Sequence, residues 1–425
     1  MNPLRFVVMG IGGYALVHLE AISWLQEQGL AELVGIVALK TDQRRSPELL
    51  KSLKSRGVVV YSDVDEFFAN GNKSADILTI PIGIHMHVPV SIAALAAGLH
   101  VYCEKPLAAT VQDLDKLITS KAKSDRKIAV GFQHIYSFSM RQLKARICDG
   151  RLGGVKEISL MCGWPRSIQY YSRNDWAGRM RRDDDWILDS PANNAHAHYL
   201  LNMLYLCSPL PDEAATPTEV RAELYRANHI DSPDTVQLEF RTKEGASGYA
   251  ILSHCNLREN GPIMHLTCEN GKVEWQGDIG KTVINYENGE QEEFDNLIHV
   301  QWRFTGFENL LQSINENSDP ICTVEMARCH TVTTNAIHES CPEIIQIPED
   351  DILEVEDWEM FPPNTKGNFR RVKNMDEYLQ EAFDRKKFLS ELKISWARHV
   401  QSQAFEIKDY NYFPQSELKQ FSEKD

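Results

Sequence analysis

The chain has 425 residues, of which 43% are hydrophobic and 25% are charged, and its formal net charge at pH 7 is -15. This length suffices for two ordinary domains, and the composition is that of a globular protein, which excludes fibrous, collagenous and disordered chains. The negative charge argues against nucleic acid or an anionic membrane surface as the main partner.

The nine cysteines form no Cys-x-x-Cys pair, which favours reduced thiols. The first apolar run begins within a few residues of Met1, which leaves no room for a signal peptide. No apolar stretch is long enough to span a bilayer. We therefore expect a cytoplasmic protein with no membrane segment, and no pattern suggests a metal site.

Apolar runs alternate with helical patterns over residues 1–130. The runs are Leu4–Met9, Leu33–Leu39, Val58–Tyr61, Ile77–Pro81, Leu99–Cys103 and Ile128–Phe132. Helical patterns lie between them, among them Tyr14–Gln28, Val88–Ala97 and Thr110–Ser124. This alternation predicts an α/β domain with a parallel sheet that is covered on both faces.

A glycine turn, Gly10-Ile11-Gly12-Gly13-Tyr14-Ala15, connects the first apolar run to the first helix. Gly10 permits the tight turn, and Gly12 lets the backbone approach a pyrophosphate held by the amides at the helix N-terminus. Together with Gly13 and Tyr14, the turn predicts a Rossmann-type dinucleotide-binding domain.

The second apolar run ends in Ala38-Leu39-Lys40, without the acidic residue that binds the ribose 2′-hydroxyl of NAD. Lys40 and Arg44 follow, and such cations bind a 2′-phosphate well, although they are also typical of a solvated surface. We therefore expect NAD(P) as the cofactor, with NADP favoured over NAD.

Residues 131–341 read as a second, α+β domain with a large, mostly antiparallel, open-faced sheet. Strand patterns follow one another without intervening helices at Val155–Cys162, Val220–Leu224, Thr235–Arg241, Ser247–Ser253, Met264–Glu269 and Lys272–Trp275. We expect two helices, Asn193–Cys207 and Gln301–Asn315, to pack on one face. Residues 342–425 form a C-terminal extension of uncertain packing, and the open sheet face invites assembly into a homo-oligomer.

Several motifs fit one family. Glu104-Lys105-Pro106 follows the apolar run that ends at Cys103, and Pro81 and His85 form a Pro-x-x-x-His spacing. With Val130-Gly-Phe-Gln133 they resemble the glucose-fructose oxidoreductase, inositol dehydrogenase and rhizopine catabolism (Gfo/Idh/MocA) family. The likeness covers about the first 340 residues and is strongest before Gly154.

The resemblance implies that the nicotinamide lies between a Rossmann domain and an open-faced sheet domain. Pro81, His85, Glu104 and Lys105 would contact the cofactor, and Lys105 would also point toward the substrate oxygen. A desolvated lysine beside a positively charged nicotinamide has a lowered pKa and can exchange a proton with that oxygen. The family also implies a cis peptide before Pro106.

The chain departs from the family where a catalytic base is expected. Family members carry Asp-x-Gly-x-His, whereas this chain keeps Asp189 but has Pro191 and Asn193 in the later positions. An amide cannot accept the substrate proton. His196 is our first choice for a displaced base, since three residues along a helix share a face. Alternatively, Lys105 transfers the proton with Asp189 as its electrostatic partner, or the protein binds cofactor without dehydrogenase turnover.

The segment from Tyr170 to Arg179 is rich in aromatic and hydrogen-bonding side chains. Such residues bind sugars, so we expect Tyr170, Trp176 and Arg179 to contact a carbohydrate-like substrate together with Asn193 and His196. The sequence thus favours an NAD(P)-dependent oxidoreductase of a sugar, polyol or sugar acid. Two alternatives stay open: an NAD-dependent glycoside hydrolase of the same family, and a non-catalytic nucleotide-dependent sensor.

Overall fold

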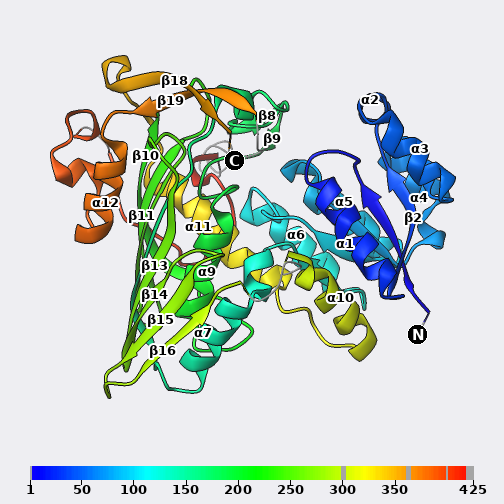
Figure 1. Cartoon of the computed structure of the whole chain (residues 1–425), viewed down its shortest axis with the longest axis horizontal. Coiled ribbons are helices and arrows are strands. Elements are labelled where there is room, and N and C mark those ends of the chain that lie inside the picture. Colours follow the sequence, from blue (N-terminus) through cyan, green and yellow to red (C-terminus); the bar gives the residue numbers. More distant parts are fainter. Residues whose placement is uncertain (1, 298–302, 360–364, 399–400, 418–425) are drawn as a thin grey trace, which may run out of the picture. The chain divides into compact units, whose positions relative to one another are not determined.

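The computed structural model describes residues 2–297, 303–359, 365–398 and 401–417, which separate into two compact units. The first unit comprises Met1–Ala108, Gln112–Tyr136 and Val300–Ala327, and the second comprises Ala109–Val111, Ser137–His299 and Arg328–Asp425. The units are therefore discontinuous in sequence, unlike the three consecutive domains that we expected. Figure 1 shows the elements of each unit.

The first unit contains a six-stranded parallel sheet in the order β3-β2-β1-β4-β5-β6. Its strands are β1 (Leu4–Met9), β2 (Ala31–Val37), β3 (Val59–Tyr61), β4 (Ile77–Ile80), β5 (His100–Cys103) and β6 (Ile128–Val130). The helices between them are α1 (Ala15–Glu27), α2 (Lys40–Arg45), α3 (Pro47–Ser55), α4 (Val64–Asn70), α5 (Ile84–Ala96) and α6 (Val111–Lys121). Val7 and Val8 point to opposite faces and are both fully buried, so both faces of the sheet are covered.

Helix α10 (Thr305–Glu316) packs in the first unit, which corrects our expectation that it lies on the second sheet. Phe307 and Leu310 join the core of β1 and α1, and the ring of Phe307 stacks on Tyr102 with centroids 4.0 Å apart. Gln301, where the predicted helix begins, lies outside the described residues. An amphipathic pattern reveals that a helix has an apolar face, but not which core that face joins.

The second unit contains a ten-stranded sheet that is mostly antiparallel, as expected. Its strands are β7 (Val155–Gly163), β10 (Pro217–Arg226), β11 (Thr235–Thr242), β12 (Ser247–Ser253), β13 (Asn260–Cys268), β14 (Gly271–Trp275), β15 (Lys281–Tyr286), β16 (Gln291–Asp295), β17 (Ile345–Gln346) and β20 (Phe405–Glu406). The pairs β7–β12 and β10–β17 are parallel. Because β7 and β12 are parallel neighbours, they end at the same edge of the sheet.

One face of this sheet carries α7 (Phe138–Cys148) and α9 (Ala197–Cys207), whose 11 residues are all buried. The predicted helix Asn193–Cys207 thus begins four residues later than expected, since residues 191–196 form turns. Between β7 and α9 the chain forms α8 (Ile168–Tyr171) and the short hairpin of β8 (Arg181–Arg182) and β9 (Asp185–Trp186). Helix α11 (Val324–Ser340) precedes the C-terminal extension.

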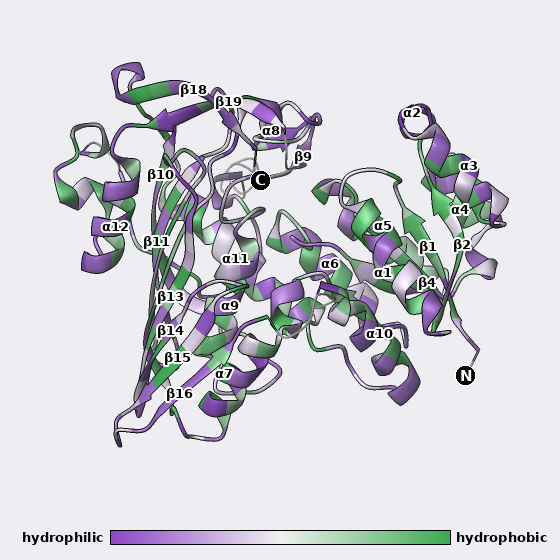
Figure 2. Ribbon diagram, in the orientation of Figure 1, coloured by the Kyte–Doolittle hydropathy of each residue, from purple (hydrophilic) through white to green (hydrophobic). Residues whose placement is uncertain are grey.

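The C-terminal extension covers part of the opposite face. It forms the hairpin of β18 (Ile352–Trp358) and β19 (Lys366–Val372) and then α12 (Met375–Arg385). Helix α12 packs on β7 and β12, and Figure 1 shows it on the side of the sheet opposite α9. Apolar and polar residues alternate along α12 (Figure 2), and its apolar side chains build a second core with Met161 and Ile251 of the sheet. No helix in the described part of the chain is long and apolar enough to cross a membrane.

Candidate functional site

The glycine turn lies at the carboxyl edge of the first sheet, between β1 and α1. Gly10 and Gly13 have φ angles of +94° and +57°, which favour glycine, and the Gly10 N–H donates to the carbonyl of Val37. A Cβ added to Gly12 would meet nothing within 4 Å. No side chain caps the N-terminus of α1, and its first turn holds no acidic residue. This end of the helix therefore suits an anionic group such as a pyrophosphate.

The other predicted cofactor residues follow neighbouring strands at the same edge. Pro81 comes directly after β4, which pairs with β1, and His85 lies in the first turn of the helix that follows, α5. Glu104 and Lys105 come directly after β5, which pairs with β4. Tyr14 donates a hydrogen bond from its hydroxyl to Gln133 at 2.8 Å. The Lys105-Pro106 peptide is cis, as the family resemblance implies.

Basic side chains gather beyond β2. Lys40 and Arg44 of α2 and Lys51 and Lys54 of α3 line an open groove with a volume of about 850 Å³. Ala38 takes the place at the end of β2 where a carboxylate would bind a ribose diol, and Gln43 donates to its carbonyl at 2.7 Å. The groove lining contains four cations and no acidic residue, so it suits an anion.

In the second unit Asp189 organises the segment that precedes α9. Its carboxylate is 5% exposed and accepts hydrogen bonds from the Gly178 N–H at 2.6 Å and from the Asn194 amide at 2.7 Å. These bonds connect the segment before β8 to the turns after β9. Asp189 is thus a hydrogen-bond hub of this loop.

Asn193 is fully buried and uses its side-chain amide on the backbone. Its Nδ2 donates to the carbonyl oxygens of Ile187 and Leu188 at 3.2 and 3.1 Å. Leu188 has a φ angle of +54°, which is uncommon for a residue with a side chain, so Asn193 holds an unusual turn in place.

His196 occupies the N-cap position of α9, without a capping hydrogen bond from its side chain, and lies in a buried cluster of rings. Its imidazole centroid is 5.0 Å from Trp164 and 4.7 Å from His254, and both contacts are edge-to-face. Because the helix begins only at Ala197, His196 and Asn193 do not share a helical face. His198 is also buried, one residue inside the helix.

His254 is a residue that the sequence analysis missed. It follows β12 directly, and Trp164 follows the parallel neighbour β7, so both come from one sheet edge. The Nδ1 of His254 lies 2.9 Å from the Trp164 carbonyl. Burial, with the positive charge of Arg166 adding to it, holds the pKa of His254 well below its ordinary value. The ring is therefore neutral, with its proton on Nδ1 and a lone pair on Nε2. A histidine directly after a predicted strand was the signal that could have revealed it.

Aromatic rings and guanidinium groups form a layered cluster beside these histidines. The guanidinium of Arg166, also missed, lies 4.8 Å from the ring centre of Tyr170, and that of Arg173 lies 3.7 Å from Tyr170 and 5.2 Å from Trp176. Arg179 is exposed in the same segment.

The two arginines that follow this segment, Arg181 and Arg182, have carboxylate partners. Arg181 pairs with Glu417, and Arg182 pairs with Asp175 at 2.8 Å. Within the described part of the chain, no carboxylate partner is seen for Arg173 or Arg179.

Comparison with known proteins identifies the N-terminal part. Residues 4–132 match the Gfo/Idh/MocA oxidoreductase family, NAD-binding Rossmann fold. An uncharacterized oxidoreductase of Rhizobium meliloti is 35% identical over 160 residues, which are 37% of this chain and 45% of that protein. Inositol 2-dehydrogenase of Azotobacter vinelandii is 28% identical over 240 residues, or 56% of this chain and 63% of that protein. The chain thus spans about half the length of the curated relatives it matches.

Solved structures share the fold over more of the chain. The WlbA dehydrogenase of Bordetella pertussis, in complex with NADH and UDP-GlcNAcA, has a TM-score of 0.65 at 22% identity and covers 80% of this chain and 96% of its own. Levoglucosan dehydrogenase, in complex with NADH and levoglucosan, has a TM-score of 0.67 at 17% identity with the same coverage. The glycine turn and the Glu104-Lys105-Pro106 segment agree with the family match, which assigns residues 4–132 to the NAD-binding Rossmann domain of the Gfo/Idh/MocA oxidoreductase family.

Proposed function

We propose that the protein is an NAD(P)-dependent oxidoreductase that moves hydride between C4 of the nicotinamide and a secondary carbinol carbon of a sugar, polyol or sugar acid. The observation that carries the proposal is the shared sheet edge of the glycine turn and Glu104-Lys105-Pro106. Ligands of open parallel sheets bind at this edge. The inositol dehydrogenases and the levoglucosan dehydrogenase among the similar proteins support the substrate class.

The residues at this edge fit a dinucleotide. Gly10, Gly12 and Gly13, together with the uncapped start of α1, would hold the pyrophosphate. The bound nicotinamide would supply the chemistry of hydride acceptance and donation. In this proposal Tyr14, Pro81, His85, Glu104 and Lys105 contact the cofactor, and the Lys105 amine also orients the substrate oxygen.

The proposal includes NADP as the preferred cofactor, with its 2′-phosphate in the basic groove that Lys40 and Arg44 line. We expect the Lys40→Ala and Arg44→Ala variants to weaken NADPH binding roughly tenfold each and to leave NADH binding unchanged, because only NADPH carries the dianion. Fluorescence titration of both cofactors tests this, with exposed Lys73→Ala as the control. Tenfold tighter binding of NADH than of NADPH by the unaltered protein would refute the preference.

For proton transfer we propose His254 as the base, with His196 and Lys105 as alternatives. The hydrogen bond from Nδ1 to the Trp164 carbonyl leaves the lone pair on Nε2, where a proton from a substrate hydroxyl can be accepted. Asp189 and Asn193 act as positioning residues, since each holds the loop before α9 through its own hydrogen bonds.

We propose a substrate with a carboxylate or phosphate substituent. Tyr170 and Trp176, with Arg173 packed on their rings, supply a mixed apolar and hydrogen-bonding surface for a sugar, while the exposed Arg179 offers forked donors to an anion. Cofactor reduction with uronates but not with neutral inositols would support an anionic substrate. Reduction with inositols alone would indicate a simple polyol.

A substrate screen tests the function. Sugars, inositols and uronates are each incubated with NAD and NADP, and the absorbance of the reduced nicotinamide is followed. On an identified substrate, His254→Gln should lower kcat/KM about 100-fold, because general base catalysis contributes that much. Release of a glycosidic leaving group without net cofactor reduction would indicate the glycoside hydrolase. Silence across the panel with intact cofactor binding would indicate the sensor.

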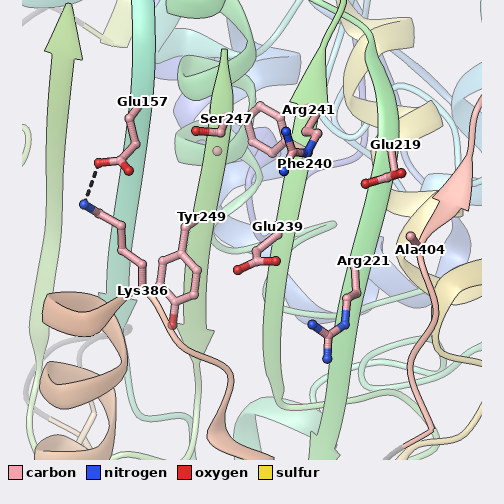
Figure 3. Close-up of a pocket in the computed structure, with 11 residues that line it drawn as sticks. Glu157, Glu219, Arg221, Glu239, Phe240, Arg241, Ser247, Tyr249, Lys386 and Ala404 are labelled. Atoms are coloured by element: carbon pink, nitrogen blue, oxygen red, sulfur yellow. Dashed lines mark hydrogen bonds and ion pairs between the residues drawn. The ribbon is translucent and has the colours of Figure 1, made fainter. Parts of the chain in front are cut away.

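We also propose that the protein forms homo-oligomers through the part of the sheet face that α12 leaves uncovered. A pocket of about 230 Å³ lies there, and charged side chains of both signs line it (Figure 3). Glu219 is opposite Arg241, and Arg221 is opposite Glu239, across β10 and β11. A patch with both signs in alternation can complement its own copy about a two-fold axis.

Light scattering after size-exclusion chromatography tests the assembly. We expect a dimer at low salt. It should dissociate at high salt, which screens the charges, and the Arg241→Glu variant should be monomeric. A monomer at all salt and protein concentrations would refute the assembly without affecting the proposed chemistry.

A further inference from the structure

Two buried histidines contact the residues on either side of Lys105. The Nε2 of His18 in α1 lies 3.0 Å from Oε1 of Glu104. His18 is fully buried, and its ring is edge-on to Tyr102 and Phe307, with centroids 5.5 and 5.0 Å away. Its Nδ1 has no hydrogen-bond partner among the described residues. A proton on Nδ1 would therefore be unsatisfied, which places the proton on Nε2, where it is donated to the Glu104 carboxylate.

The Glu104 carboxylate is held on three sides. Besides His18, its Oε2 accepts from the Lys105 N–H at 3.3 Å. It also lies against Gly131 at the end of β6, where an added Cβ would be 2.6 Å from Oε1. The carboxylate thus connects α1, the end of β6 and the backbone of Lys105 within the first unit.

His87 in α5 holds the other side of the segment. Its Nδ1 lies 2.7 Å from the Pro106 carbonyl, and its Nε2 lies 3.0 Å from the Ile82 carbonyl. His87 is 1% exposed, and burial lowers its pKa, so the ring is neutral at pH 7 and donates one hydrogen bond. The shorter contact places that donor on Nδ1, toward Pro106. Through His87 the loop after β4 contacts the segment after β5.

We propose that His18 and His87 are positioning residues that fix Lys105 by holding Glu104 and Pro106, and that His18 connects the cofactor-binding turn to Lys105. His18 lies in the first turn of α1, directly beyond the glycine turn, so a displacement of that turn on cofactor binding reaches Glu104 through one hydrogen bond. The inference rests on the proposed role of Lys105, but its test needs no substrate.

Chemical labelling of Lys105 tests the connection. The full-length protein is acylated with an N-hydroxysuccinimide ester, with and without NADPH, and the labelling rate of Lys105 is measured by peptide mass spectrometry relative to exposed Lys123 in the same sample. His18→Phe keeps an aromatic ring between Tyr102 and Phe307 but removes the hydrogen-bond donor to Glu104, whereas His18→Gln keeps a donor. We expect Lys105 to react at least about threefold faster in His18→Phe, because the loss of a charge-assisted hydrogen bond loosens the segment, and at nearly the original rate in His18→Gln.

NADPH should change the labelling rate of Lys105 in the unaltered protein and in His18→Gln, and have no effect on it in His18→Phe. His87→Phe should speed up labelling in the same way as His18→Phe but leave the NADPH effect intact. If His18→Phe does not fold, Glu104→Gln removes the same charge-assisted bond and should give the same labelling result. Equal labelling in all variants would overturn the inference. Altered labelling in a protein that oxidises no sugar would instead contradict the proposed function and leave the inference standing.

Discussion

Individual side chains in this protein take their roles from the hydrogen bonds they make rather than from their place in a motif. Asn193 stands where the sequence resemblance led us to expect a histidine, yet its amide donates to the carbonyls of Ile187 and Leu188. Its contribution is to the turn at Leu188, whose φ angle is +54°. A substitution at this position therefore acts first on the loop that carries Asp189.

We expect Asn193→Ala to lower the free energy of unfolding by about 2 kcal/mol, because two buried backbone carbonyls lose their donor. Asn193→His, which introduces the residue expected from the resemblance, should also destabilise the protein and not raise kcat, since one ring N–H cannot replace two amide hydrogens. Urea denaturation measures both variants, with exposed Asn285→Ala as the control. Stability equal to that of the unaltered protein in Asn193→His would contradict this role.

At the scale of elements, the C-terminal extension decides which part of the large sheet is exposed. Helix α12 presents Leu379, Ala382 and Phe383 to the sheet, where they form a core with Met161 and Ile251. The ring of Phe383 also lies 5.0 Å from His265 of β13. This part of the sheet face is therefore occupied by the chain's own helix, and the charged pocket lies on a part of the sheet that α12 leaves uncovered (Figure 3).

The variant Leu379→Ala should lower the free energy of unfolding by roughly 2–5 kcal/mol, because it leaves a cavity between α12 and the sheet. Glu377→Ala, on the exposed side of the same helix, should change it by less than about 0.5 kcal/mol. Thermal and urea denaturation compare the two. Equal effects would mean that α12 does not pack on the sheet in solution.

Across the whole molecule, both units contain buried histidines. Burial disfavours the charged form of their imidazole rings. The pKa of His100 in the first unit and that of His338 in the second are each lowered to about 4. Between pH 6.5 and 4 the unfolded chain therefore binds protons that the folded chain does not. Stability consequently falls as the pH falls through this window. Buried Glu223 and Asp234, whose pKa values burial raises, act in the opposite direction.

A substitution isolates one of these contributions. His338 lies near the ring of Phe413, with centroids 6.2 Å apart, so His338→Phe suits its surroundings. On acidification from pH 7 to pH 5, we expect the unaltered protein to lose roughly 2 kcal/mol more stability than His338→Phe. Urea unfolding at the two pH values gives this difference directly. An identical pH dependence in both proteins would mean that His338 is not buried in its neutral form.

The first sheet and its carboxyl edge could be predicted from local patterns of residues alone. Apolar runs and glycine turns are local patterns, so β1 was predicted to the residue, and the Gly10 and Lys105 segments were placed after their strands. The strand patterns of the second unit are local in the same way, and the mostly antiparallel sheet that they predicted is confirmed.

How segments distant in sequence pack together could be seen only in the folded chain. The apolar face of α10 joins the core of β1 and α1, whereas the apolar face of α12 packs on part of the second sheet. The amphipathic pattern of either helix would allow it to pack on any apolar surface. His254 lies beside Trp164 because β7 and β12, 92 residues apart at Val155 and Ser247, are parallel neighbours. Long-range pairing of this kind depends on the packing of the whole unit, and no local pattern of residues encodes it.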